Sequence, residues 1–193
     1  MSASTSEPKV SAAGQETYHK ARLFAAGSLA LAMSGIAASL RANTATDLQR
    51  IFLDPIDKAK SAEMIGAILG LPFLGYAVTI AIGSPLLDYI GMGLLLPLSG
   101  VLFSIGALIM IFAGSIASGA AVYNVLWAGA LVTGIGWGLV ETVTNPMVAS
   151  LYPDDKTSKL NAVHAWWPGG LVIGGLLGVG MSNVDIGWQW KLA

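Results

Sequence analysis

The sequence has no cysteine and only two histidines among its 193 residues. The absence of cysteine excludes disulfide bonds, thiol catalysis and the zinc sites that are built from cysteine. Two histidines are too few for a convincing metal cluster, so we expect neither a metal site nor a cofactor. The chain also lacks a recognisable pair of nucleophile and base, and its glycines do not form a phosphate-binding loop. These absences predict a protein that is not an enzyme.

Charged residues are scarce as well. They make up 11% of the chain, whereas soluble domains carry about 25%. The formal net charge of -1 argues against a nucleic-acid partner. Hydrophobic residues reach 54% and the mean hydropathy is +0.68, so the lipid bilayer is the expected surrounding.

The apolar residues gather in stretches of the length that crosses a bilayer as a helix, about 20 residues. We therefore predict an all-α membrane protein with about five spans. Residues 1–20 are polar and without apolar periodicity, which is typical of a disordered tail. Residues 21–193 form the transmembrane domain, with spans expected at about 23–45, 64–87, 92–112, 122–151 and 162–181.

The segments between these stretches are expected to be irregular. Residues 46–62 are the most charged and contain Asp54-Pro55, which indicates an extramembrane loop. Residues 113–121 are mostly small and suggest a turn. Residues 156–159 are expected to form the end of a hydrophilic loop. After the fifth span, Trp188 and Trp190 suggest an interfacial loop with an aromatic belt. The chain ends where a further span is expected, which favours a truncated product or a fragment.

Glycines recur at four-residue spacing in two of the spans. The second span contains Gly66 and Gly70, and the fifth contains Gly170, Gly174 and Gly178. Small residues at this spacing let transmembrane helices approach closely, so both sets are expected to mark helix–helix contacts.

Glu141 is a lone carboxylate in the fourth span. An ionisable group in a membrane helix costs about 2.5–3.5 kcal/mol on insertion scales and is functional by default. Asn145 lies one helical turn further on the same face. Glu141 therefore has two interpretations, a proton-binding group in a cavity or a static hydrogen-bond or ion-pair partner, for example of Arg41 in the first span. The lipid-facing side of this helix is expected to comprise Leu139, Val140 and Val143.

Other polar side chains at span ends have competing interpretations. Arg41 either snorkels to the membrane surface or faces a cavity. Asn145 either contacts the solute or only accompanies the kink at Pro146. Asn161 is a residue type that commonly occupies the N-cap of a helix. His164 lies one turn later; histidine can titrate near neutral pH, but near a span end it is more often an interfacial residue.

Two adjacent tryptophans follow His164. A tryptophan ring suits the apolar face of a sugar, but at a membrane boundary it more often belongs to an aromatic belt. For Trp166 we favour the belt, and for Trp167 both interpretations stay open.

Several motifs resemble a known family. Ser84–Gly91, with Asp88 and Gly91, resembles the signature between the second and third helices of the major facilitator superfamily. Gly-x-Gly-x-Gly-Leu-x-Glu-Thr-x-x-Asn-Pro, at 134–146, is similar to the fourth helix of its fucose–proton symporter branch. The Leu160-Asn161 pair and Trp188-Gln189-Trp190 also match the superfamily. The chain thus resembles the N-terminal helical half of such a transporter, ending before the sixth helix.

This resemblance implies roles for individual residues. Glu141 would take part in proton coupling and sugar recognition, and Asn161 in sugar binding. The branch also uses an aspartate in its first helix, whereas residues 38–44 here contain Arg41 and Asn43 but no acid. The resemblance places the N-terminal tail and the 154–159 loop in the cytoplasm and the protein in the cell (inner) membrane.

The sequence therefore predicts a secondary active transporter that moves a small polar solute, a sugar or related metabolite, by proton-coupled alternating access. Its partners would be the lipid bilayer, the solute, protons and the missing C-terminal helical half. Glu141 would carry the proton, with Asn145, Asn161 and Arg41 along the solute path. One alternative is an organic-anion transporter in which Arg41 pairs with the solute. The other is a non-transporting fragment or partner subunit that binds another helical half.

Overall fold

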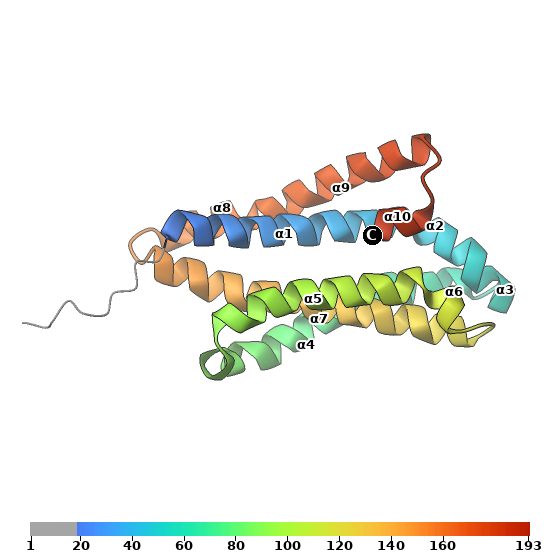
Figure 1. The fold of residues 1–193 in the computed structure, drawn as a ribbon, viewed down its shortest axis with the longest axis horizontal. Coiled ribbons are helices and arrows are strands. Elements are labelled where there is room, and N and C mark those ends of the chain that lie inside the picture. Colours follow the sequence, from blue (N-terminus) through green and yellow to red (C-terminus); the bar gives the residue numbers. More distant parts are fainter. Residues whose placement is uncertain (1–18) are drawn as a thin grey trace, which may run out of the picture.

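The structure, a computed structural model, describes residues 19–193. Within this part of the chain every regular element is a helix, and five helical segments are long and apolar enough to cross a membrane (Figure 1). The predicted fold class, an all-α membrane protein with about five spans, is confirmed. The predicted tail at residues 1–20 lies outside the described residues except for its last two.

Four of the spans are single helices and the fifth consists of two. The single helices are α1 (Lys20–Asn43), α4 (Ser61–Ile90), α5 (Met92–Ile111) and α7 (Ala121–Leu151). The fifth span comprises α8 (Lys156–His164) and α9 (Trp166–Asn183).

The segments expected to be irregular contain short helices. Residues 46–62 are largely helical because Leu48 and Leu53 are fully buried in the core. Pro55 falls in the first turn of a helix, where its missing N–H is not needed. The prediction of a loop at 156–159 is also wrong, since α8 begins at Lys156. The short helices are α2 (Ala45–Leu48), the π-helix η1 (Gln49–Leu53), α3 (Asp54–Asp57), α6 (Ala113–Ile116) and α10 (Trp188–Leu192).

The C-terminal segment folds back onto the bundle. Trp188 of α10 is buried and meets Phe52 edge to face at a centroid distance of 5.7 Å. The Nζ of Lys191 donates to Asn43 Oδ1 at 3.0 Å and to Ser182 Oγ at 2.7 Å. The predicted interfacial loop is thus a docked helix, and only Trp190 keeps the exposure of a belt residue.

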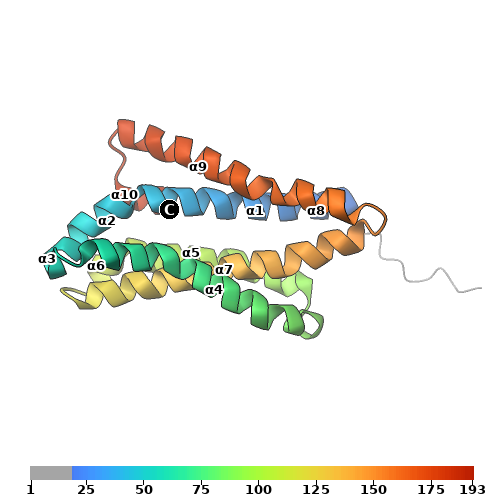
Figure 2. The same ribbon diagram turned by 180° about the vertical axis from the view of Figure 1, so that it is seen from behind.

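The long helices form two groups, which Figures 1 and 2 show from opposite sides. In the first group α4 and α5 both pack along α7, and in the second α1 packs along α9. The two groups meet mainly where α1 and α8 contact α7. Helix α7 is the most buried of the spans, so its side chains face neighbours on several sides.

Glycines allow the close contact between α1 and α9. A Cβ atom at Gly170 would overlap the backbone of Ala32, and one at Gly174 would lie 2.6 Å from the carbonyl oxygen of Ile36. Gly178 approaches Asn43 in the same way. The glycine contact predicted for the fifth span is present. That predicted for Gly66 and Gly70 is wrong, since no neighbouring helix comes within 4 Å of either position.

Candidate functional site

One face of α7 carries a polar stripe. Thr133, Trp137, Glu141 and Asn145 follow one another at four-residue spacing and so lie above one another on the helix. The Glu141 side chain is buried, and Asn145 Nδ2 donates to its Oε2 at 3.3 Å. The stripe thus joins a buried carboxylate to an amide one turn away.

His164 completes this cluster from the end of α8. Its Nε2 lies 2.7 Å from Asn145 Oδ1, and its Nδ1 lies 3.9 Å from Glu141 Oε2. The imidazole is 44% exposed whereas the Glu141 side chain is 7% exposed. We refer to Glu141, Asn145 and His164 as the Glu141 cluster. The alternative that Glu141 pairs with Arg41 is wrong, because no such contact exists among the described residues.

The expected lipid-facing side of α7 is buried instead. Leu139 and Val143 pack with Leu87 of α4 and Leu95 of α5. Val140 packs with Leu31 of α1. The middle of α7 has helices on all these sides, so apolar residues there meet protein and not lipid.

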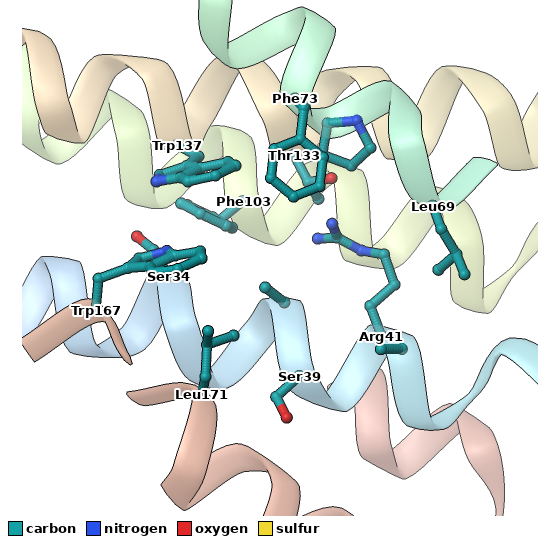
Figure 3. Close-up of a pocket in the computed structure, with 13 residues that line it drawn as sticks. Ser34, Ser39, Arg41, Leu69, Phe73, Phe103, Thr133, Trp137, Trp167 and Leu171 are labelled. Atoms are coloured by element: carbon teal, nitrogen blue, oxygen red, sulfur yellow. The ribbon is translucent and has the colours of Figure 1, made fainter. Parts of the chain in front are cut away.

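A cavity of about 370 Å³ lies between the two helix groups (Figure 3). All five spans contribute to its wall. The lining residues used below are Ser34 and Arg41 from α1, Phe73 from α4, Phe103 from α5, Thr133 and Trp137 from α7, and Trp167 from α9.

Arg41 is the one charged residue that lines this cavity. It belongs to the last turn of α1 and is 8% exposed. Its guanidinium extends between the helix groups toward Thr133 and Phe73 (Figure 3). Among residues 19–193 no carboxylate lies within ion-pair distance of it. Of the two interpretations from sequence, the cavity position is the one observed.

Trp137 is the centre of an aromatic wall. Its ring is stacked on Trp167, with centroids 5.6 Å apart and planes 3° apart, and it also contacts Phe73 and Tyr76. The indole Nε1 atoms of Trp137 and Trp167 are both buried and have no hydrogen-bond acceptor in the described part of the chain. Trp167 therefore belongs to the cavity, while Trp166 is half exposed, as expected of a belt residue.

Asn161 lies away from these groups. It is exposed, within α8, and does not line the cavity. Asp155 occupies the N-cap position of α8, so the interpretation of Asn161 as an N-cap is wrong. The structure brings Glu141, Asn145 and His164 together, and Arg41 and Trp167 together, but it leaves Asn161 apart.

Several cavity residues were not among the candidates from sequence. Trp137 and Thr133 precede Glu141 by four and eight residues, so a helical stripe drawn through Glu141 would have included them. Ser34 likewise precedes Arg41 by seven residues, which is two helical turns. Phe73 and Phe103 carry no comparable signal, because apolar residues in spans are common.

The arrangement places a cation and aromatic rings around one cavity, with a buried carboxylate and a histidine next to them. No group of three or more potential metal ligands occurs in the part of the chain that the structure describes.

Comparison with known proteins identifies the family. The sequence model of the Major Facilitator Superfamily matches residues 22–192, which is nearly the whole chain. No curated protein and no solved structure shows significant similarity. The chain therefore belongs to the major facilitator superfamily, and it is an integral membrane protein of a family whose members are transporters and not enzymes.

Proposed function

We propose that this chain is the helical half of a secondary active transporter that moves a small organic anion, in the cell (inner) membrane, coupled to protons. The observation that carries the proposal is the position of Arg41, which is buried, lines the cavity and has no carboxylate partner among the described residues. A second helical half would close the cavity and alternate its access between the two sides of the membrane.

A buried arginine without a partner is energetically costly. Guanidinium stays charged in proteins, and an uncompensated buried charge costs about 3–5 kcal/mol when its partner is removed. A carboxylate or phosphate on the solute would supply the missing charge, and the planar fork of the guanidinium matches both groups. The cavity is thus suited to a solute with one anionic group.

The aromatic wall supports a second property of the solute. Trp137, Trp167 and Phe103 present flat apolar surfaces to the cavity (Figure 3). Aromatic surfaces bind flat or apolar groups through offset stacking and edge contacts. A flat organic acid would use both these surfaces and the cation.

A sugar is the second candidate. The resemblance to the fucose–proton symporter branch favours it, and Trp137 and Trp167 in the cavity wall suit the apolar face of a sugar ring. A neutral sugar leaves Arg41 without a counter-charge, however, and Asn161 is not near the cavity. The geometry therefore ranks an organic anion above a sugar.

Transport by the full transporter in sealed vesicles tests this proposal. Benzoate, its neutral analogue benzamide and L-fucose would be compared in the wild type and in Arg41→Gln. We expect benzoate flux in the wild type, and a loss of about tenfold or more in Arg41→Gln because a charge-assisted contact contributes about 1.5–3 kcal/mol. Arg41→Lys should retain part of the flux, since it keeps the charge but loses the fork.

Arg50→Gln is the matched control. Arg50 is exposed and pairs with Asp47 in η1 and α2, so its replacement should leave flux unchanged. If fucose is transported and its flux is unchanged in Arg41→Gln, the sugar and not the organic anion would be the solute. Absence of flux for all three solutes, together with stable binding of a separate helical protein, would favour the non-transporting partner subunit.

A further inference from the structure

We infer that Glu141 and His164 bind a single proton between them, with Asn145 fixing the imidazole in the required orientation. The inference rests on the proposed proton-coupled transport and deepens it, since it assigns the coupling proton to a pair of residues on two helices. It stands on the geometry of the Glu141 cluster.

Asn145 determines which nitrogen of His164 carries a proton. Its Nδ2 donates to Glu141 Oε2 at 3.3 Å, which leaves its Oδ1 to face His164 Nε2 at 2.7 Å. An amide oxygen only accepts hydrogen bonds, so Nε2 must donate. In a neutral imidazole the other nitrogen, Nδ1, then carries a lone pair.

That lone pair faces the carboxylate. Nδ1 lies 3.9 Å from Glu141 Oε2, and neither atom has a proton when the carboxylate is ionised and the imidazole is neutral. Two acceptors then lie 3.9 Å apart, one on a buried carboxylate and one on a partly exposed imidazole. One added proton removes this conflict, either on the carboxyl group or on Nδ1 as an imidazolium. The pair therefore changes its charge by one unit and not by two.

Few other ionisable groups face this pair. From α4, Tyr76 packs against the ring of Trp137, which precedes Glu141 by one turn of α7. From α8, Lys159 lies beside Asp155 and over the ring of Tyr152. From α1, Arg41 points into the cavity, and α5 and α9 contain no ionisable side chain. Tyr76 is therefore the neighbour whose replacement should also change the titration.

The Glu141–His164 pair lies next to the aromatic wall of the cavity. Glu141 follows Trp137 by one turn of α7, and His164 precedes Trp167 by three residues at the junction of α8 and α9. The Glu141–His164 pair thus joins α7 to α8, and the Trp137–Trp167 stack joins α7 to the adjoining start of α9. Loss of the proton weakens one bridge, so it should alter the wall to which the solute binds.

The first experiment needs no solute. The chain contains two histidines, His19 and His164, so the protein labelled with ¹⁵N-histidine in detergent micelles gives a simple NMR spectrum in which His164→Gln identifies the His164 signals. We expect the neutral His164 to carry its proton on Nε2, and Glu141→Gln to change the pH dependence of the His164 signals, because the carboxylate would no longer share the proton. Two results would overturn the inference: a proton on Nδ1 of the neutral His164, or a pH dependence of the His164 signals that is the same in Glu141→Gln and in the wild type.

The second experiment measures the linkage in the full transporter with benzoate as probe. Wild-type affinity should differ between acid and alkaline buffer by a factor in the range of about 5–150. Glu141→Gln and His164→Gln should each reduce this ratio to near one, and the double variant should be no worse than either, because the two residues share one proton. His19→Gln is the matched control and should behave as wild type.

The two failures are distinguishable. Wild-type transport without any pH linkage would refute proton coupling itself, whatever the NMR titration shows. Linkage that Glu141→Gln removes and His164→Gln leaves intact would keep the proposed function and refute the shared proton. Independent, additive losses in the two single variants would also refute it.

Discussion

At the scale of single residues, the contact between α1 and α9 depends on the absence of side chains. Gly169 and Gly170 are neighbours in α9, but only Gly170 faces α1, where the Ala32 backbone occupies the space of a Cβ atom. Gly169 has nothing within 4 Å. Two adjacent glycines of the same helix therefore have opposite requirements.

Gly170→Ala should destabilise the protein by about 1–3 kcal/mol, since an added methyl group in a filled contact forces the backbones apart. Gly169→Ala should be neutral or stabilising by up to about 1 kcal/mol, because alanine favours helix where space is free. Thermal unfolding in detergent measures both. Equal effects of the two substitutions would contradict the close approach of α1 and α9.

At the scale of elements, the anchoring of α10 depends on Lys191. This side chain is buried and holds Asn43 of α1 and Ser182 of α9 at once. Lys191→Met keeps much of the volume but removes both hydrogen bonds of the ammonium group, and hydrogen bonds to charged groups contribute about 1.5–3 kcal/mol.

We therefore expect Lys191→Met to release α10 and expose Trp188, which iodide quenching of tryptophan fluorescence would detect. Lys156→Met, at the exposed start of α8, is the control and should not alter quenching. Unchanged quenching in Lys191→Met would show that the burial of Trp188 against Phe52 holds α10 without the lysine.

The helices themselves were largely predictable, since their long apolar stretches admit no other structure in a bilayer. The helical spacing also predicted that Glu141 and Asn145 share a face. Their third partner was not predictable in this way, because His164 reaches them from another span. The burial of Leu139 and Val143 was not predictable for the same reason. The sequence indicates which residues share a face of a helix, but it does not indicate which other helix covers that face.

At the scale of the whole molecule, two helix groups enclose the cavity. A Cβ at Gly83 of α4 would lie 3.8 Å from the Thr142 Cβ of α7, which is the usual separation across a disulfide, about 3.8 Å. Because the chain contains no cysteine, paired cysteines can be introduced without removing others.

Gly83→Cys with Thr142→Cys should cross-link efficiently under mild oxidation, and transport should survive because both residues belong to one group. Gly70→Cys with Thr142→Cys is the control that should not cross-link, as nothing lies within 4 Å of a Cβ at Gly70 of α4. Gel mobility after protease cleavage in the α4–α5 turn measures both. A failure of the first pair to cross-link would refute the packing of α4 on α7.

The pairing of α1 with α9 also has a consequence for biogenesis. The ribosome completes α1 first, and α4, α5 and α7 all follow before α9 is made. Chains fold largely in the order of their synthesis, so the surface of α1 that fits the α9 glycines has no partner during that interval. This surface of α1 therefore faces lipid or another protein until α9 is inserted, and the insertion of α9 forms the α1–α9 contact.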